Sequence, residues 1–493
     1  MNGRVMAAGS MRMRSAPAGA AAMVLAAAAI FVSLAIADYV GWQRLKPEVS
    51  AVSWIADIPN TEDHLLNIHQ RAMVRAKGSP DSFLPIYDVQ NPGFFLLVAE
   101  LYVRAGATTP VALEITSMVL FNIAAVCFFF WVYFLFSDLT VAVVGTIALT
   151  LSKFFLFFPG TTHTFPFEFF FFNLTMLFFV LFLKTDRKVY LAASLVAMFM
   201  TCMNYWFYYM SSWIIVVGLW WQYRGRPGLK DLALLSAPAI AAAAFTTAMV
   251  MALFGGVGKG FHRLADILVA RTFDARIAGA NWYPDRRFMG PLDWVAYPRT
   301  VVDRIEWAFS LEFFWFALAA VYALFFLSLH NRKSFVSALI LLLGGFSWYF
   351  TVFQHTHIHY FVGQYSFMAI CPLFGLIVSE AFFLARRSLH RATEVKRGKS
   401  LAADFTAAAL LLVLVLATIW PFATNTYRLV SQTADTARTV QAKYAQAVQA
   451  ICHDHSKVTL ESLEEASRNW GFKWLPHLIT ETNRTPECPS KGA

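Results

Sequence analysis

Charged residues are scarce in this chain of 493 residues: they make up 14% of it, against 58% apolar residues. An average soluble domain is about 25% charged and about 45–50% apolar. So few charges cannot cover a water-exposed surface, which excludes a soluble globule and a disordered chain. Five cysteines are too few for a disulfide-rich scaffold. Many apolar runs approach or exceed the roughly 18–20 residues that cross a hydrocarbon core, which predicts an all-α polytopic membrane protein.

The apolar runs predict eleven transmembrane helices. The first is the Ala-rich run that ends at Ala37. It is longer than the roughly 7–15 residues of a signal-peptide core, although Ala35-Ile36-Ala37 also resembles a cleavage site, and that alternative stays open. The other predicted spans are 111–136, 141–158, 167–183, 189–203, 207–221, 232–254, 307–329, 334–353, 362–385 and 401–420.

Basic residues fall on one side of this predicted topology. With the N-terminus inside, the inside segments contain Arg4, Arg12, Arg14, Lys184, Arg187, Lys188, Arg224, Arg226, Lys230, Arg332, Lys333, Arg386, Arg387, Arg391, Lys396, Arg397 and Lys399. The short outside connections 159–166, 204–206 and 354–361 contain no Lys or Arg. This asymmetry is the usual signature of orientation. The net charge of +10 therefore indicates topology rather than nucleic-acid binding.

Three long segments fall outside in this topology: 38–110, 255–306 and 421–493. Long connections between packed elements usually carry function. No glycine-rich phosphate loop precedes an inside helix, which argues against an ATP-driven machine, and no repeat or broken-helix pair supports an inverted-repeat transporter. We therefore expect a transmembrane catalytic domain over residues 1–420, with its site on the outer face, and a small outside domain over 421–493.

The first outside segment contains an acidic pair, Glu62-Asp63, at the start of a helix predicted over 65–77, with Asn60 as its cap. One interpretation is structural, because carboxylates stabilise a helix N-terminus. The other is that one carboxylate takes a proton from an acceptor hydroxyl or binds a metal. Adjacent helical residues point about 100° apart, so only one of the two is expected to face a substrate.

This acidic pair, the turn at Asn91-Pro92 and a short helix ending at Gly106 resemble the polyprenyl-phosphate-sugar glycosyltransferases. These are membrane enzymes of the GT-C fold, and they include protein O-mannosyltransferases and aminoarabinose transferases. The resemblance covers the span pattern, with its motifs concentrated in residues 57–106. It implies inverting transfer of a sugar from a polyprenyl-phosphate carrier to a glycan, lipid or protein acceptor, with Glu62 or Asp63 as the base. It implies no certain cofactor and leaves a divalent metal open.

The resemblance also suggests residues for the donor phosphate and sugar. The second acid of the family, which precedes a proline, falls here at Thr164, so His163 or Glu168 is expected to replace it. Glu168 lies just inside an apolar run, where a carboxylate is costly and therefore a functional candidate. A polar turn is the alternative for the segment around His163. His64, beside the acidic pair, is a further donor-site candidate.

Two further outside segments are candidates for the donor phosphate. His359-Tyr360 resembles the end of a basic-x-x-His-Tyr stretch that lies near the carrier phosphate in the family. Arg286-Arg287 offers planar guanidinium groups that suit phosphate oxygens. The alternative for these arginines is a basic surface that contacts lipid head groups.

His355, His357 and His359 alternate along the chain, so an extended segment would place all three on one side. Three imidazoles suit zinc, while phosphate or sugar contact and a solvated turn are the other interpretations. The aromatic run 204–209 predicts an interfacial belt, with a sugar-stacking platform as the alternative.

In the predicted outside tail, Cys452 and Cys488 are expected to form a disulfide. Together, the span pattern, the charge distribution and the family resemblance predict an integral protein of the bacterial inner membrane. Its N-terminus is expected in the cytoplasm, and its catalytic face and C-terminus in the periplasm. Its expected partners are the lipid-linked donor, the acceptor and membrane lipids, and not nucleic acid. The competing functions are a transporter or flippase of lipid-linked glycans and a structural membrane protein.

Overall fold

The computed structural model describes residues 17–42, 109–157, 165–253, 256–272, 293–358 and 360–394, with single residues between 420 and 428. Every element in these ranges is helical, and none of their residues is in a strand. The predicted all-α class is therefore confirmed. The tail beyond 428 lies outside the described residues, and the proposed domain boundary at 420 stays a prediction.

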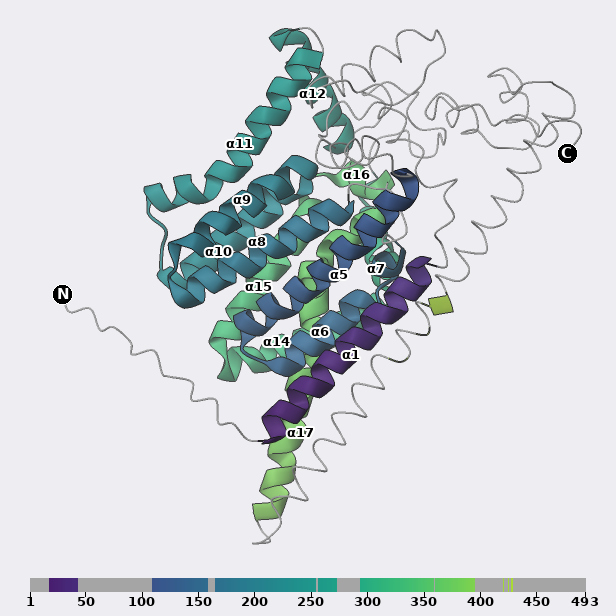
Figure 1. Cartoon of the computed structure of the whole chain (residues 1–493), viewed down its shortest axis with the longest axis vertical. Helices are drawn as coiled ribbons and strands as arrows, with labels where there is room; N and C mark the ends of the chain where they lie inside the picture. Colours follow the sequence, from purple (N-terminus) through teal and green to yellow (C-terminus); the bar gives the residue numbers. More distant parts are fainter. Residues whose placement is uncertain are drawn as a thin grey trace, which may run out of the picture.

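Long apolar helices make up most of the described chain (Figure 1). They are α1 (Pro17–Trp42), α5 (Thr109–Phe136), α6 (Leu139–Thr150), α8 (Phe165–Thr185), α9 (Lys188–Asn204), α10 (Phe207–Arg224), α11 (Leu229–Leu253), α14 (Phe313–His330), α15 (Arg332–Phe346) and α17 (Phe367–Glu394). Six segments in the described chain are long and apolar enough to cross a membrane, and three shorter apolar helices accompany them. The chain is a membrane protein by this criterion, and the count of eleven spans stays a prediction.

Two predicted spans are broken. The span 141–158 divides into α6 and the short helix α7 (Lys153–Phe157), and the Ser152 hydroxyl caps α7 by accepting from the Phe155 amide at 3.3 Å. The predicted span 307–329 begins in the end of α13 (Tyr297–Phe309), which stops at Ser310 in a left-handed conformation with φ 53°. Apolar residues continue across this break, so hydropathy alone could not locate it.

The predicted outside segment 255–306 contains two amphipathic helices, α12 (Val257–Thr272) and α13. Charged residues alternate with apolar ones along both helices, a pattern that suits a membrane surface or the edge of a core better than a span. Three short helices, η5 (Ser347–Phe350), α16 (Phe353–Ile358) and η6 (Tyr360–Ser366), connect α15 to α17. Figure 1 shows α12 and α16 toward the same end of the molecule.

The basic connections gather at the opposite end of the bundle, here called the basic end. Lys184, at the end of α8, donates to the Ser137 hydroxyl between α5 and α6 at 3.4 Å. Arg224, at the end of α10, pairs with Asp186 at 2.6 Å. The Gln222 amide donates to the carbonyl of Lys333, near the start of α15, at 2.6 Å. The structure thus brings together segments predicted to share one side of the membrane.

A polar contact sits inside the aromatic core and joins α5 to α8. The indole nitrogen of Trp131 donates to Oδ1 of Asn173 at 2.9 Å, and both side chains are fully buried. The Asn173 amide nitrogen donates to the Phe169 carbonyl one turn earlier, at 2.8 Å. The Phe169 ring packs against Phe121 and Phe367, with ring centroids 5.1 and 4.8 Å away. Both ends of the buried amide are therefore satisfied.

Candidate functional site

Five polar or aromatic side chains from distant parts of the chain meet near the end of the bundle opposite the basic end. We call them the outer cluster: Glu168, Tyr205, Trp348, His355 and Tyr365. They come from α8, the α9–α10 turn, η5, α16 and η6. All five are buried, and Glu168 is fully so. Buried polar groups of this kind require partners, because an unpaired one costs about 1–3 kcal/mol.

His355 is held from both sides of its ring. The indole nitrogen of Trp348 donates to Nδ1 at 3.2 Å, and Nε2 lies 3.2 Å from the Tyr205 hydroxyl. Since an indole N–H can only donate, Nδ1 must accept, and the neutral imidazole then carries its proton on Nε2. His355 therefore donates to Tyr205. The two contacts fix both the orientation and the tautomer of the ring.

The cluster continues from His355 toward Glu168. The Tyr205 and Tyr365 rings stack with centroids 5.3 Å apart. Glu168 lies close enough to Tyr365 and to the fully buried Tyr208 to interact with both electrostatically. Hydrogen bonds, ring stacking and these electrostatic interactions thus link α16 to the first turn of α8 through the interior of the protein.

Arg304 of α13 fixes the same region from another direction. It is buried, and its guanidinium donates to the carbonyls of Thr356 and His357 at 3.1 and 2.6 Å. These are the last carbonyls of the short helix α16, which have no partner within the helix. Gly363 of η6 packs directly on the Arg304 carbonyl, where a side chain has no room. Arg304 therefore clamps α16 and η6 onto α13.

The imidazole of His357 lies beside this clamp. Burial, followed by the neighbouring Arg304 charge, lowers the pKa of His357 below its usual value, while Asp293 opposes the shift. A lowered pKa favours the neutral ring at physiological pH. His357 is thus a neutral donor or acceptor at the edge of the site rather than a permanent cation.

Zinc binding by His355, His357 and His359, one of three interpretations of this segment, stays a prediction, because His359 lies outside the described residues. That prediction required an extended segment, but residues 353–358 form helix α16, because the Arg304 clamp and the His355 contacts fold this stretch into the core. Side chains two residues apart on a helix point to nearly opposite sides. Across the described ranges, no group of three or more His, Cys, Asp or Glu side chains could hold a metal.

The structure describes only some of the other predicted site residues. The structure brings Glu168 and His355 into one cluster. Tyr360 begins η6, and the structure describes only its backbone. The remaining predicted residues lie outside the described ranges, and their roles stay predictions: Glu62, Asp63, His64, His163, Arg286, Arg287, His359, Cys452 and Cys488.

The interfacial aromatic belt predicted over 204–209 is wrong for its central members. Tyr205 is 8% exposed, and Phe207 and Tyr208 are fully buried. Phe207 stacks on Tyr365 with ring centroids 4.3 Å apart. Sequence reasoning missed Trp348 and Tyr365 because they lie in apolar spans, where an aromatic residue is unremarkable.

Comparisons with known proteins add little to this description of the site. No protein-family model and no curated protein matches the chain. Among solved structures, the chain is similar to the oligosaccharyltransferase of Archaeoglobus fulgidus in its apo form, at 12% identity and a TM-score of 0.48. The similarity covers 82% of this chain and 56% of that one, so the chain spans little more than half the length of its structural neighbour. A similarity at this level does not assign a function.

Proposed function

We propose that this chain is a membrane glycosyltransferase that moves a sugar from a polyprenyl-phosphate carrier to an acceptor on the outer face. The observation that carries the proposal is the way the structure holds the α16–η6 connection, where His359-Tyr360 lies. Arg304 and the outer cluster fix the helices on both sides of this dipeptide. A pair of side chains that binds phosphate must be held in a fixed position relative to the substrate, and these contacts would hold the backbone of His359-Tyr360 in this way.

The acidic pair Glu62-Asp63 belongs to the segment that leaves α1 and returns to α5. Figure 1 shows α1 ending and α5 beginning toward the end of the bundle that holds α16. This arrangement supports a site to which residues 43–108 and the α16–η6 connection both contribute. The resemblance of residues 57–106 to polyprenyl-phosphate-sugar glycosyltransferases supplies the chemistry.

In the proposed reaction, Glu62 or Asp63 accepts the proton of the acceptor hydroxyl as its oxygen attacks the anomeric carbon. The bond from that carbon to the phosphate oxygen breaks on the opposite face, so the configuration inverts. The leaving phosphate gains negative charge, which nearby cationic and hydrogen-bonding groups stabilise. His359, Tyr360, Arg286, Arg287, His64 and His163 are the residues proposed for this role. Glu168 and His355 of the outer cluster are proposed as positioning residues for this site.

A flippase or transporter of lipid-linked glycans is the second candidate, and buried Glu168 is the observation that favours it. Carboxylates inside membrane-spanning segments are common along transport pathways. The two functions differ in one measurable respect, because only a transferase breaks the bond between the sugar and the carrier phosphate.

The test is to incubate the purified protein with labelled polyprenyl-phosphate sugars, with and without a chelator, and to measure free carrier phosphate and sugar transfer. We expect loss of the essential carboxylate, in either Glu62→Gln or Asp63→Asn, to lower turnover by at least about 100-fold, since the amide cannot take a proton. Glu48→Gln removes a nearby acid outside the motif and serves as the matched control.

A capping role for the acidic pair predicts a different result. Asp63→Asn would then lose about 1 kcal/mol of stability or less and keep its activity. If Glu62→Gln, Asp63→Asn and the double variant all fold and transfer sugar at the wild-type rate, neither carboxylate is the base. Movement of the lipid-linked sugar across vesicles without release of carrier phosphate would instead establish the transporter.

A further inference from the structure

A groove runs between α10 and α15 at the basic end of the bundle. Its volume is about 880 Å³, which lies within the roughly 300–1,000 Å³ that is typical of ligand sites. Apolar side chains line most of its length, among them Val217, Leu339 and Leu343. Trp221 lines it near the basic end and is 63% exposed, so the groove opens on the surface that a lipid bilayer would cover.

The polar end of the groove is rigidly built. The Gln222 amide nitrogen donates to the Lys333 carbonyl at 2.6 Å, and its oxygen accepts from the Ser337 hydroxyl at 3.0 Å. The Tyr223 hydroxyl donates to the Leu135 carbonyl of α5 at 3.2 Å. These bonds join three helices around one end of the groove.

This polar end carries a strong excess of positive charge. The ammonium of Lys333 lies 4.0 Å from the centroid of the Tyr223 ring, and that of Lys184 lies 5.8 Å from the same centroid. Arg332 and Lys333 line the groove, whereas neither Lys184 nor any carboxylate is among its lining residues. The nearby Asp186 is paired with Arg224 at 2.6 Å. The two lysines repel each other, so an anion at the groove cations would relieve unfavourable charge at this end.

We propose that this groove binds an anionic phospholipid, with its head-group phosphate at Arg332 and Lys333 and one acyl chain along the apolar wall. Two features support a lipid over a free phosphate. The apolar length of the groove continues directly from the cations, and a Trp beside the polar end is typical of the membrane interface. Anionic lipids also favour basic pockets between transmembrane helices at the cytoplasmic surface, which is where the predicted orientation places this end.

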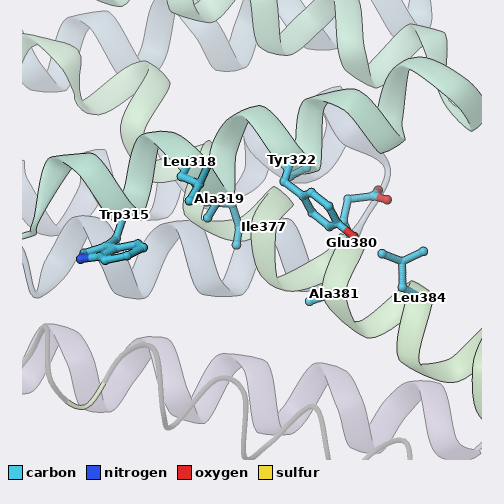
Figure 2. A pocket seen from close by; sticks show the side chains of 9 residues that line it. Trp315, Leu318, Ala319, Tyr322, Ile377, Glu380, Ala381 and Leu384 are labelled. Carbon is cyan, nitrogen blue, oxygen red and sulfur yellow. The ribbon is translucent and has the colours of Figure 1, made fainter.

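A second groove between α14 and α17 provides an internal contrast (Figure 2). It has a volume of about 480 Å³, and its lining is also mostly apolar. Its charged lining residue is Glu380, which Figure 2 shows beside Tyr322 and which pairs with His330 at 3.3 Å. A carboxylate at this position disfavours a phosphate, so the anionic lipid is expected in the first groove and not in the second.

Native mass spectrometry of the full chain in detergent, titrated with phosphatidylglycerol or phosphatidylcholine, tests the proposal. The wild type should prefer phosphatidylglycerol, and Arg332→Gln/Lys333→Gln should lower its affinity for that lipid by about 10-fold or more. The matched control is Arg226→Gln/Lys230→Gln, which removes two basic residues at the same end outside the groove. Leu339→Trp should fill the groove and also weaken binding, whereas Leu318→Trp, in the second groove, should not.

Several outcomes would overturn the proposal. Unchanged lipid selectivity in the Arg332→Gln/Lys333→Gln variant would exclude these cations as the site. An equal loss in the Arg226→Gln/Lys230→Gln control would show only a general surface charge. Full binding by Leu339→Trp would show that a phosphate can bind without an acyl chain in the groove. If the double variant of the groove elutes as an aggregate, the comparison of Leu339→Trp with Leu318→Trp decides the question.

Discussion

Replacing His355 with alanine should destabilise the protein more than an ordinary polar substitution would. The change removes the acceptor of the Trp348 indole N–H and the donor to the Tyr205 hydroxyl, both of which lie in a buried cluster. Each buried group that loses its partner costs about 1–3 kcal/mol, so the two together predict a loss of about 2–6 kcal/mol. His355→Gln should lose less, because its amide can accept from Trp348 and donate toward Tyr205.

Unfolding of the purified protein in mixed micelles, titrated with a denaturing detergent, measures this difference. His357→Ala is the matched control, since it removes an imidazole two residues along and keeps the backbone carbonyl that Arg304 binds. The expected order of stability is wild type, His357→Ala, His355→Gln and His355→Ala, from highest to lowest. Combining His355→Ala with Tyr205→Phe should give a coupling energy of about 0.5–3 kcal/mol, as for residues in one network.

Two results would refute this reasoning. Equal losses for His355→Ala and His357→Ala would show that the bonds around His355 contribute nothing specific. Additive effects of His355→Ala and Tyr205→Phe would show that the 3.2 Å contact between them is not a stabilising hydrogen bond.

Two further predictions concern the region around Arg304. Gly363→Ala should destabilise the protein by at least about 1–3 kcal/mol, because the added Cβ would overlap the Arg304 carbonyl. Gly258→Ala is the control and should be tolerated, because there is open space around its Cβ. Equal thermal midpoints for the two variants would contradict this prediction. Stability should also fall as the pH drops below 6.5, the usual pKa of a histidine, because the lowered pKa of His357 means that the unfolded chain binds the proton more readily. His357→Gln should show a shallower decline of the thermal midpoint between pH 7 and 5, and an unchanged slope would exclude His357 as its source.

Much of the helical framework could be predicted from the sequence. Apolar runs locate α5, α8, α9 and α17 because a helix that crosses lipid must be apolar over a set length. The distribution of Lys and Arg predicted which connections share one end, and contacts such as Arg224 with Asp186 agree with it. The break at Ser310 could not be predicted, since it depends on how α13 packs rather than on hydropathy.

The candidate site was less predictable, for a physical reason. Glu168 stands out in an apolar run because a carboxylate there is costly. Whether the 354–361 connection is buried or exposed depends instead on partners far away in the sequence, such as Tyr205 and Arg304. Its histidines and glutamine make it polar, and a solvated turn was one of its three interpretations, yet Gln354, His355 and Thr356 are buried. Tertiary partners make a polar segment suitable for the interior, and a single sequence does not identify them.

The buried hydrogen bond between Trp131 and Asn173 also has a consequence for where the candidate site lies along the helices. This bond favours one axial alignment of α8 against α5, because sliding one helix along the other would separate the Trp131 indole N–H from Oδ1 of Asn173 in an apolar core. Glu168 lies five residues before Asn173, which is about 7.5 Å along the helix axis. The position of this carboxylate along the helix bundle is therefore set from within the core, by a bond about one and a half helical turns away.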